Sequence, residues 1–245
     1  MQLPSYVALS QQTALQRQVE VIANNLANIS TPAFKSDRLI FSEFVQSAGD
    51  PADPTATMSF VREVGSVRDL RDGAIAPTGN TFDFAIQGPG YFAVQAPGGT
   101  RYTRNGTFHL DGQGRVVTVD NFPVLDSSNS PITMRTGESR FEVTAEGQIS
   151  TDSGTLARIQ IATFTDEQSM KKAGAGLYET EETPRPADPK QTSLRQGMIE
   201  GSNVQSILEV TSLIEVSRRY QMAQNVMSSE NDLQTKAIQQ LGRVA

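Results

Sequence analysis

The feature that most constrains this chain is a heptad-spaced apolar stripe in its final stretch, from Gly201 to Leu241. Ser202, followed three residues later by Gln205, predicts a helix start, and Gly242 after Leu241 predicts its end. Apolar side chains at steps of three and four form one helix face: Leu213, Val216, Tyr220, Ala223 and Met227, with Ala237 and Leu241 resuming the phase. No neighbouring segment can cover this stripe, so it requires a partner.

The beginning of the chain repeats the pattern. Its apolar residues step by four and three until Ser30-Thr31-Pro32 ends the helix: Leu15, Val19, Ile22, Leu26 and Ile29. We expect the two terminal helices to pair antiparallel as a coiled-coil-like helical domain. Further apolar residues make both faces wider than one partner can hide: Val7, Ala14, Val21, Ile207, Val210, Leu233 and Ile238. This surplus predicts contacts with neighbouring subunits.

Between the helices the apolar period changes to two, which predicts short strands. The alternation runs from Phe82 to about Tyr178, and glycine-rich turn signals such as Gly88-Pro89-Gly90 divide it. The predicted fold is therefore α+β, with an all-β domain inserted between long terminal helices. Its predicted parts are an N-terminal helix at 1–35, an extended connecting segment at 36–80, the β-domain at 81–180, a linker at 181–200 and a C-terminal helix at 201–245.

Composition excludes several functions. A net charge of −6 and a pI near 4.9 disfavour nucleic-acid binding, which needs a clustered basic face. The chain has no cysteine and one histidine, which removes thiol chemistry and any site that needs two imidazoles. We expect no direct membrane insertion, because no window approaches ~18 apolar residues, and no Sec-type signal peptide at the start.

The candidate chemical motifs favour structural interpretations. His109 lies between Phe108 and Leu110, so alternation places it on a solvated strand face without a visible nucleophile. Gly88-Pro89-Gly90 lacks the rest of a phosphate loop, and Asp111-Gly112-Gln113-Gly114 lacks the ligands of a calcium loop. We predict no catalytic residue, no cofactor and no metal.

Three asparagines in five residues, Asn24, Asn25 and Asn28, are unusual because they lower helix propensity while the apolar stripe continues. They are typical of a fraying helix before the stop at Pro32. Alternatively, their amides bind an adjacent helix or subunit and fix its register. Both interpretations remain open at this point.

Three blocks of sequence resemble the axial proteins of the bacterial flagellum, the rod and hook proteins. The blocks are Val21-Ile22-Ala23-Asn24-Asn25-Leu26-Ala27-Asn28-Ile29-Ser30-Thr31-Pro32-Ala33-Phe34-Lys35; Phe84-Ala85-Ile86-Gln87-Gly88-Pro89-Gly90-Tyr91-Phe92-Ala93-Val94 with Tyr102-Thr103-Arg104-Asn105-Gly106-Thr107-Phe108; and Gly197-Met198-Ile199-Glu200-Gly201-Ser202-Asn203-Val204. The short length and the segments Glu200–Val204 and Arg218-Arg219-Tyr220 look most like a proximal-rod subunit, with the distal rod as the near competitor. One departure is Ala33, where the family commonly has glycine, and this puts a left-handed turn there in doubt.

The resemblance implies a non-enzymatic subunit that the flagellar type III apparatus exports without a cleaved signal peptide. It implies self-association, contacts with other rod proteins and a place in the periplasmic rod of the basal body. The predicted assembly interface comprises Leu15, Val19, Ile22, Asn24, Asn25, Leu26, Asn28, Ile29, Leu213, Val216, Tyr220, Ala223, Met227 and Leu241. Two other possibilities stay open: a periplasmic enzyme with a β-domain on a coiled-coil stalk, and a phage or pilus fibre adaptor.

Overall fold

The computed structural model describes residues 3–47, 57–135, 137–138 and 140–241. It has long helices at both ends and a β-rich region between them, which confirms the α+β class. The chain divides into two compact units, each considered by itself. The helical unit contains residues 1–27, 37–69 and 205–245, and the β unit contains residues 28–36 and 70–204.

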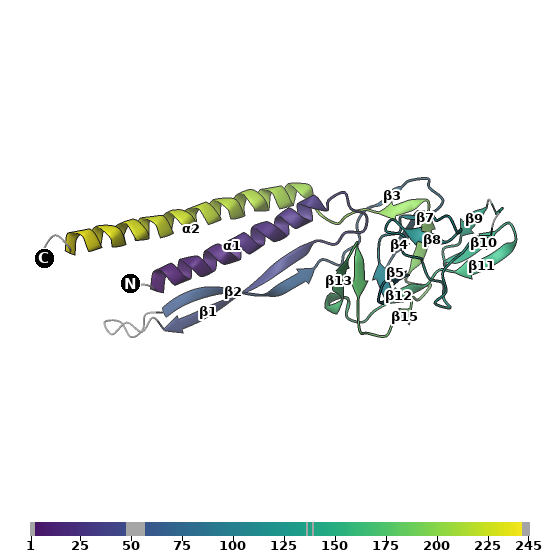
Figure 1. Cartoon of the computed structure of the whole chain (residues 1–245), viewed down its shortest axis with the longest axis horizontal. Coiled ribbons are helices and arrows are strands. Elements are labelled where there is room, and N and C mark those ends of the chain that lie inside the picture. Colours follow the sequence, from purple (N-terminus) through teal and green to yellow (C-terminus); the bar gives the residue numbers. More distant parts are fainter. Residues whose placement is uncertain (1–2, 48–56, 136, 139, 242–245) are drawn as a thin grey trace. The chain divides into compact units, whose positions relative to one another are not determined.

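The helical unit consists of α1 (Leu3–Ala27), β1 (Asp37–Ser47), β2 (Thr57–Arg68) and α2 (Ser206–Leu241). Within it, α1 lies between α2 and the antiparallel β1–β2 pair (Figure 1). Part of the segment predicted as a connection at 36–80 thus forms a long antiparallel pair, in which Phe44 lies opposite Phe60. Strand β2 accounts for Thr57–Arg68 of this predicted extended segment.

Helix α2 begins at Ser206, so the predicted start at Ser202 is wrong. The Ser202 hydroxyl instead accepts a hydrogen bond from the amide of Val204 (3.2 Å), two residues on, which belongs to a local turn. The Asn203 side chain does not cap the helix either, because its Oδ1 accepts a hydrogen bond from the Ser36 amide (2.9 Å). The predicted stop at Gly242 lies outside the described residues.

The β unit is built from short strands. Their bounds are β3 (Ile75–Pro77), β4 (Phe84–Gln87), β5 (Tyr91–Ala96), β6 (Gly99–Thr103), β7 (Phe108–Leu110), β8 (Val116–Thr118), β9 (Phe141–Val143), β10 (Gln148–Thr151), β11 (Gly154–Arg158), β12 (Ile161–Thr163), β13 (Lys171–Gly174), β14 (Leu177–Glu179), β15 (Arg185–Pro186), β16 (Ser193–Gln196) and β17 (Met198–Glu200), with a 3₁₀ helix at Glu167–Ser169. The largest sheet has six strands in the order β13-β14-β6-β5-β12-β15.

Strand β5 shows why alternation gives this unit its core. Phe92 and Val94 belong to one buried cluster, which also contains Phe84 and Ile149, whereas Tyr91 and Ala93 belong to another. Successive side chains of a strand point to opposite faces, so one strand contributes to two clusters. A strand buried on both faces reads as a continuous apolar run, as Tyr91–Val94 does.

The segment predicted as a linker before the last helix is folded onto the β unit. Strand β16 pairs with β4, and β17 pairs with β3, so this returning segment supplies strands to two small sheets. Its prolines are compatible with this arrangement because Pro186 lies in β15, the edge strand of the large sheet, where a missing amide donor costs little. The opposite edge strand, β13, carries Lys171 and Lys172, which disfavour pairing with another sheet.

Candidate assembly surface and buried ion cluster

The apolar stripes predicted on the two terminal helices meet in one cluster. Four of the predicted residues are buried in it, and three more pack against it: Leu15, Ile22, Val216 and Ala223, with Val19, Leu213 and Tyr220. The Gln12 amide also donates to the Tyr220 hydroxyl (3.1 Å). The helices run antiparallel, so that the beginning of α1 and the end of α2 lie at the same end of this unit (Figure 1). The predicted antiparallel contact between α1 and α2 is therefore confirmed.

The other predicted interface residues lie outside that cluster. Leu26, Ile29 and Met227 are half-buried, and Asn24 is exposed. Leu241 is the last residue of α2. The cluster thus occupies the middle of the predicted seam and does not extend along its whole length.

Asn25 has a different role from the predicted contact with a neighbouring helix. Its side chain is buried and binds the backbone of Asp37 at the start of β1, with Nδ2 donating to the Asp37 carbonyl (3.0 Å). The Asp37 amide in turn donates to Asn25 Oδ1 (3.1 Å). One asparagine thereby satisfies both polar groups of a backbone residue, because its amide carries a donor and an acceptor side by side. Within this chain the Asn25 amide is thus occupied by Asp37 and not by a neighbouring helix. The fraying hypothesis is wrong for Asn25, because this part of α1 is held by a buried side chain.

Asn28 stabilises the turn that follows α1. The Thr31 amide donates to the Asn28 carbonyl (3.1 Å), and the Thr31 hydroxyl donates to Asn28 Oδ1 (3.1 Å). Two residues later Ala33 has φ of 56°, so the left-handed conformation occurs without glycine. The left-handed turn that alanine had put in doubt is therefore present at Ala33. Its amide donates to the Glu200 carbonyl (2.8 Å), which holds the strained residue in place.

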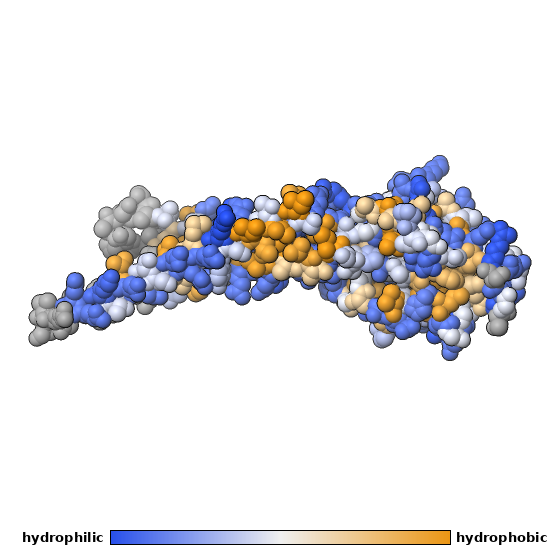
Figure 2. All heavy atoms as spheres, turned by 90° about the horizontal axis from the view of Figure 1, so that it is seen from above, coloured by the Kyte–Doolittle hydropathy of each residue, from blue (hydrophilic) through white to orange (hydrophobic). Residues whose placement is uncertain are grey.

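The helical unit exposes many large apolar side chains. On α2 they include Ile207, Leu208, Val210, Ile214, Met222, Val226 and Leu233; on the other elements they include Tyr6, Leu9, Ile40, Phe44, Val45, Val61, Val64 and Val67. Figure 2 shows hydrophobic residues gathered on one part of this unit's surface. Removing a side chain of this size fully from water contributes about 1.5–3 kcal/mol. A surface of this kind is suited to association with other protein chains.

A buried ion cluster in the β unit was not foreseen from the sequence. Glu200 accepts from Lys35 Nζ (2.7 Å) and from the Gly73 amide (3.0 Å) through Oε1, and from Arg104 Nε (2.7 Å) through Oε2. The side chains of Lys35, Arg104 and Glu200 are only 4%, 5% and 1% exposed. Asp72, which is 47% exposed, adds an ion pair to Arg104 at 2.8 Å. This cluster ties together segments that are far apart in the chain.

The charges within the cluster satisfy one another. Burial by itself raises the pKa of the Glu200 carboxyl, but the charges and hydrogen bonds of Arg104 and Lys35 outweigh it, so the net pKa lies below its usual range. The remaining donors reach backbone carbonyls, with Arg104 Nη1 at 2.7 Å from Gly90 and Lys35 Nζ at 2.8 Å from Arg71. Glu200 is therefore held as a carboxylate.

The sequence did contain one signal for this cluster. Each of the three blocks that resemble flagellar proteins contributes one member: Lys35 from the first, Arg104 from the second and Glu200 from the third. Each is the only charged residue in its block, and single opposite charges inside otherwise uncharged motifs favour a shared buried site. Their pairing could not be assigned from spacing, because 165 positions separate Lys35 from Glu200.

The described part of the chain offers neither a metal site nor a membrane-spanning helix. No group of three or more His, Cys, Asp or Glu side chains there could hold a metal ion. None of the helices within residues 3–241 that the structure describes is long and apolar enough to cross a membrane. His109 is exposed on β7, as the alternation predicts.

Paired terminal helices with an apolar outer surface, joined to a β unit, are the architecture of a structural subunit that assembles with other chains. The chain belongs to the family of flagellar basal-body rod proteins. It is 34% identical to the flagellar basal-body rod protein FlgF of Caulobacter vibrioides over 98% of both chains, and 32% identical to the FlgF of Mesorhizobium japonicum over 99% of both. It is also 31% identical to the flagellar basal-body rod protein FlgG of Agrobacterium fabrum, over 93% of this chain and 95% of that one.

Three family descriptions match separate parts of the chain. Residues 6–35 match "Flagella basal body rod protein", residues 85–151 match "Flagellar hook protein FlgE/F/G D1 domain", and residues 195–240 match "Flagellar basal body rod FlgEFG protein C-terminal". The resemblance seen in the sequence is therefore confirmed, with FlgF as the better match. The chain is a structural subunit of the flagellar rod in the basal body and not an enzyme.

Proposed function

We propose that this chain is a subunit of the proximal rod, where its terminal helices pack into the wall of the tubular drive shaft that crosses the periplasm. The observation that carries this proposal is the apolar surface of the helical unit, which continues beyond the α1–α2 cluster. A helix pair that still exposes Ile207, Ile214 and Val226 gains stability from further protein neighbours. The similarity to FlgF supports the proximal position.

The pairing of α1 with α2 is proposed to be coiled-coil-like. Leu15, Ile22, Val216 and Ala223 support this, because each helix contributes two buried residues seven positions apart. Leu26, Ile29 and Met227 are proposed to complete the interface in the assembled rod. Its partners would be further copies of this chain and the proximal-rod and distal-rod subunits next to it.

Export by the flagellar type III apparatus, without cleavage of a signal peptide, is part of the same proposal and rests on membership of the family. A distal-rod position is the alternative, because the similarity to FlgG covers almost as much of the chain. The two positions differ in where the subunit lies along the shaft.

Electron microscopy of sheared basal bodies, labelled with antibody against this chain, tests the proposal. Label at the inner end of the rod supports a proximal subunit, and label at the outer end supports the distal alternative. Basal bodies that carry no label, from cells that produce and export the chain, contradict the assignment to the rod. A strain that lacks the gene provides the labelling control.

A further inference from the structure

The β unit ends in a segment that binds the earlier parts of the unit, residues 192–204, here called the closing segment. Its first strand, β16, forms a two-stranded sheet with β4, and its second strand, β17, forms one with β3. Among the described residues, β3 and β4 therefore find their ladder partners in the closing segment. The segment also reaches the turn after α1, because the Asn203 amide donates to the Phe34 carbonyl (3.1 Å).

Side chains of the closing segment also enter the body of the unit. Leu194 is 3% exposed and belongs to the main buried cluster, together with Phe92 of β5. Gln196 joins the segment to β9, since its Oε1 accepts from the Val143 amide (3.0 Å) and its Nε2 donates to the Phe141 carbonyl (2.8 Å). Without the closing segment the cluster would lose a core residue, and these backbone groups of β9 would lose their partners.

The earlier part of the unit is shaped to receive the backbone of the closing segment. A Cβ added at Gly73 would lie 2.0 Å from the carbonyl oxygen of Gly201, whereas real Cβ atoms essentially never have such a contact under 3.0 Å. At the same place the Gly201 amide donates to the Ala74 carbonyl (2.8 Å). Glycine at position 73 thus allows two backbones to lie in direct contact.

The closing segment also brings the buried counter-charge of the ion cluster. Lys35 and Arg104 belong to earlier parts of the chain and are almost fully buried, and both contact Glu200 at 2.7 Å. Asp72 lies 3.7 Å from Lys35 and 2.8 Å from Arg104, but it is 47% exposed. A buried cation that lacks its buried partner is costly, so the folded form of the earlier residues is unfavourable until Glu200 is in place.

We propose that the closing segment controls when the β unit folds: the unit folds only once residues 192–204 bind, and it opens only as a whole. A chain is synthesised from its N-terminus, so the body of the unit is complete long before the closing segment exists. When the closing segment has been made, only the 41 residues from 205 to 245 remain. The β unit therefore stays unfolded during most of the synthesis of the chain. This inference goes beyond the proposed function and does not depend on the position of the subunit in the rod.

Hydrogen exchange of the full-length parent chain, followed by mass spectrometry, tests the proposal. Strand β5 is the reporter, because it belongs to the six-stranded sheet, which contains neither β16 nor β17. We expect peptides from β5 and peptides from residues 194–200 to open with the same free energy, because the unit opens as a whole. Exchange that is about ten-fold or more faster in residues 194–200, while β5 stays protected, overturns the proposal.

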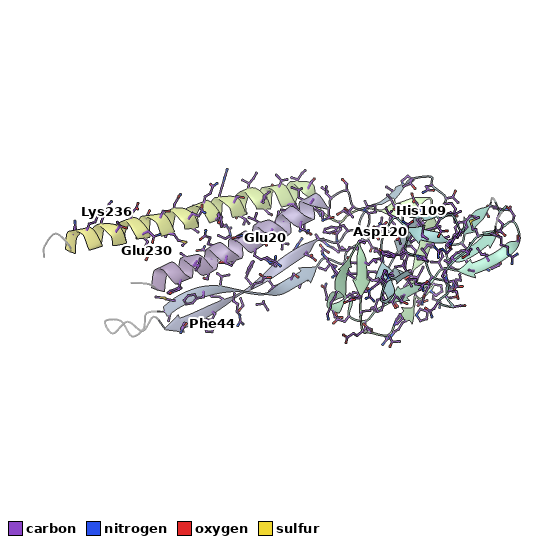
Figure 3. All side chains as sticks on the ribbon, in the orientation of Figure 1. Glu20, Phe44, His109, Asp120, Glu230 and Lys236 are labelled. Carbon is purple, nitrogen blue, oxygen red and sulfur yellow. The ribbon has the colours of Figure 1, made fainter. Side chains whose placement is uncertain are left out.

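A single added methyl group blocks the seat of the closing segment in the full chain. Gly73→Ala places a Cβ against Gly201, and Gly112→Ala is the matched control. Gly112 lies in the turn after β7, the strand that carries His109 (Figure 3), and an added Cβ there has nothing within 4 Å. Neither glycine has a left-handed φ, so the two variants differ in the contact with the closing segment.

Gly73→Ala should lose the protection of β5 together with that of residues 194–200, whereas Gly112→Ala should exchange like the parent. Fast exchange confined to residues 194–200 in Gly73→Ala, with β5 still protected, overturns the proposal. Leu194→Ala provides a milder variant that retains the fold. It should speed exchange about 30-fold or more, and by the same factor in β5 as in residues 194–200, because a Leu-to-Ala change in a core destabilises the whole cooperative unit. Acceleration in residues 194–200 alone contradicts the proposal.

Discussion

Replacing Glu200 by glutamine should destabilise the β unit severely. Glu200→Gln keeps the side-chain shape but removes the charge that balances Lys35 and Arg104, whose side chains are 4% and 5% exposed. Breaking a buried ion pair from one side typically costs about 3–5 kcal/mol, because the remaining charge stays buried. Asp72 still contacts Arg104 at 2.8 Å, so we expect the lower end, about 3 kcal/mol.

Thermal unfolding of the full chain measures this loss. For a unit of this size, each kcal/mol lowers the midpoint by about 2–4 °C, so Glu200→Gln should lower it by roughly 10 °C. The chain has no tryptophan, and three of its five tyrosines, Tyr91, Tyr102 and Tyr178, lie in one buried cluster of the β unit. Near-ultraviolet circular dichroism of tyrosine therefore follows this unit.

A surface ion pair of the same unit provides the control. Arg140 and Glu142 are 61% and 59% exposed and lie 2.7 Å apart, so Glu142→Gln should change stability by less than about 0.5 kcal/mol. If Glu200→Gln shifts the midpoint no more than Glu142→Gln does, the buried cluster does not hold the β unit together. The double variant Lys35→Met/Glu200→Gln should lower the free energy of unfolding by less than the two single substitutions added together, since the two residues share one interaction.

The stability contributed by Glu200 also depends on pH in a defined direction. Its pKa is lowered in the folded protein, since Arg104 and Lys35 outweigh the opposing effect of burial. The contribution is therefore fully present above the unfolded pKa, near ~4.3, and is lost as the pH falls through the lower folded value. The stability difference between the parent and Glu200→Gln should shrink at acidic pH; a difference that grows there would contradict the ionised carboxylate.

Three further substitutions test local features. Ala33→Gly should stabilise the chain by up to about 1 kcal/mol, because φ of 56° strains alanine; lower stability would show that its buried methyl outweighs the strain. Asn25→Ala should lower the free energy of unfolding by about 1–3 kcal/mol and reduce the helix content measured by circular dichroism, because both backbone groups of Asp37 lose their partner. An unchanged spectrum and an unchanged thermal midpoint would contradict a stabilising role of Asn25. Gly106→Ala should abolish the native near-ultraviolet signal, since an added Cβ would lie 1.8 Å from the Phe84 carbonyl oxygen; a native signal would mean that the backbone can shift there.

The sequence predicted the helical packing well because the information is local. Leu15 and Ile22, like Val216 and Ala223, are seven residues apart and reveal a helix face without knowledge of the partner. The exposed position of His109 followed equally from alternation with its neighbours.

The features that the sequence did not predict depend on distant residues. Lys35 and Glu200 meet only in the folded β unit, and nothing near either one indicates its partner. Asn25 was assigned to a neighbouring helix because its link to Asp37 follows from the path of the chain after α1. The strands β16 and β17 were taken for a linker because their pairing partners lie more than 100 residues earlier.

The central claim is that the apolar surface of the helical unit drives incorporation into the rod. Two valines of nearly equal exposure test it: Val226 on α2 is 61% exposed, and Val119 in the β unit is 63% exposed. The measurement is the amount of each exported variant, Val226→Asp or Val119→Asp, in purified basal bodies by quantitative immunoblot. We predict that Val226→Asp is exported but nearly absent from basal bodies, because a buried charge is costly in an assembled apolar contact, whereas Val119→Asp is incorporated like the parent. Equal incorporation of the two variants would contradict the claim.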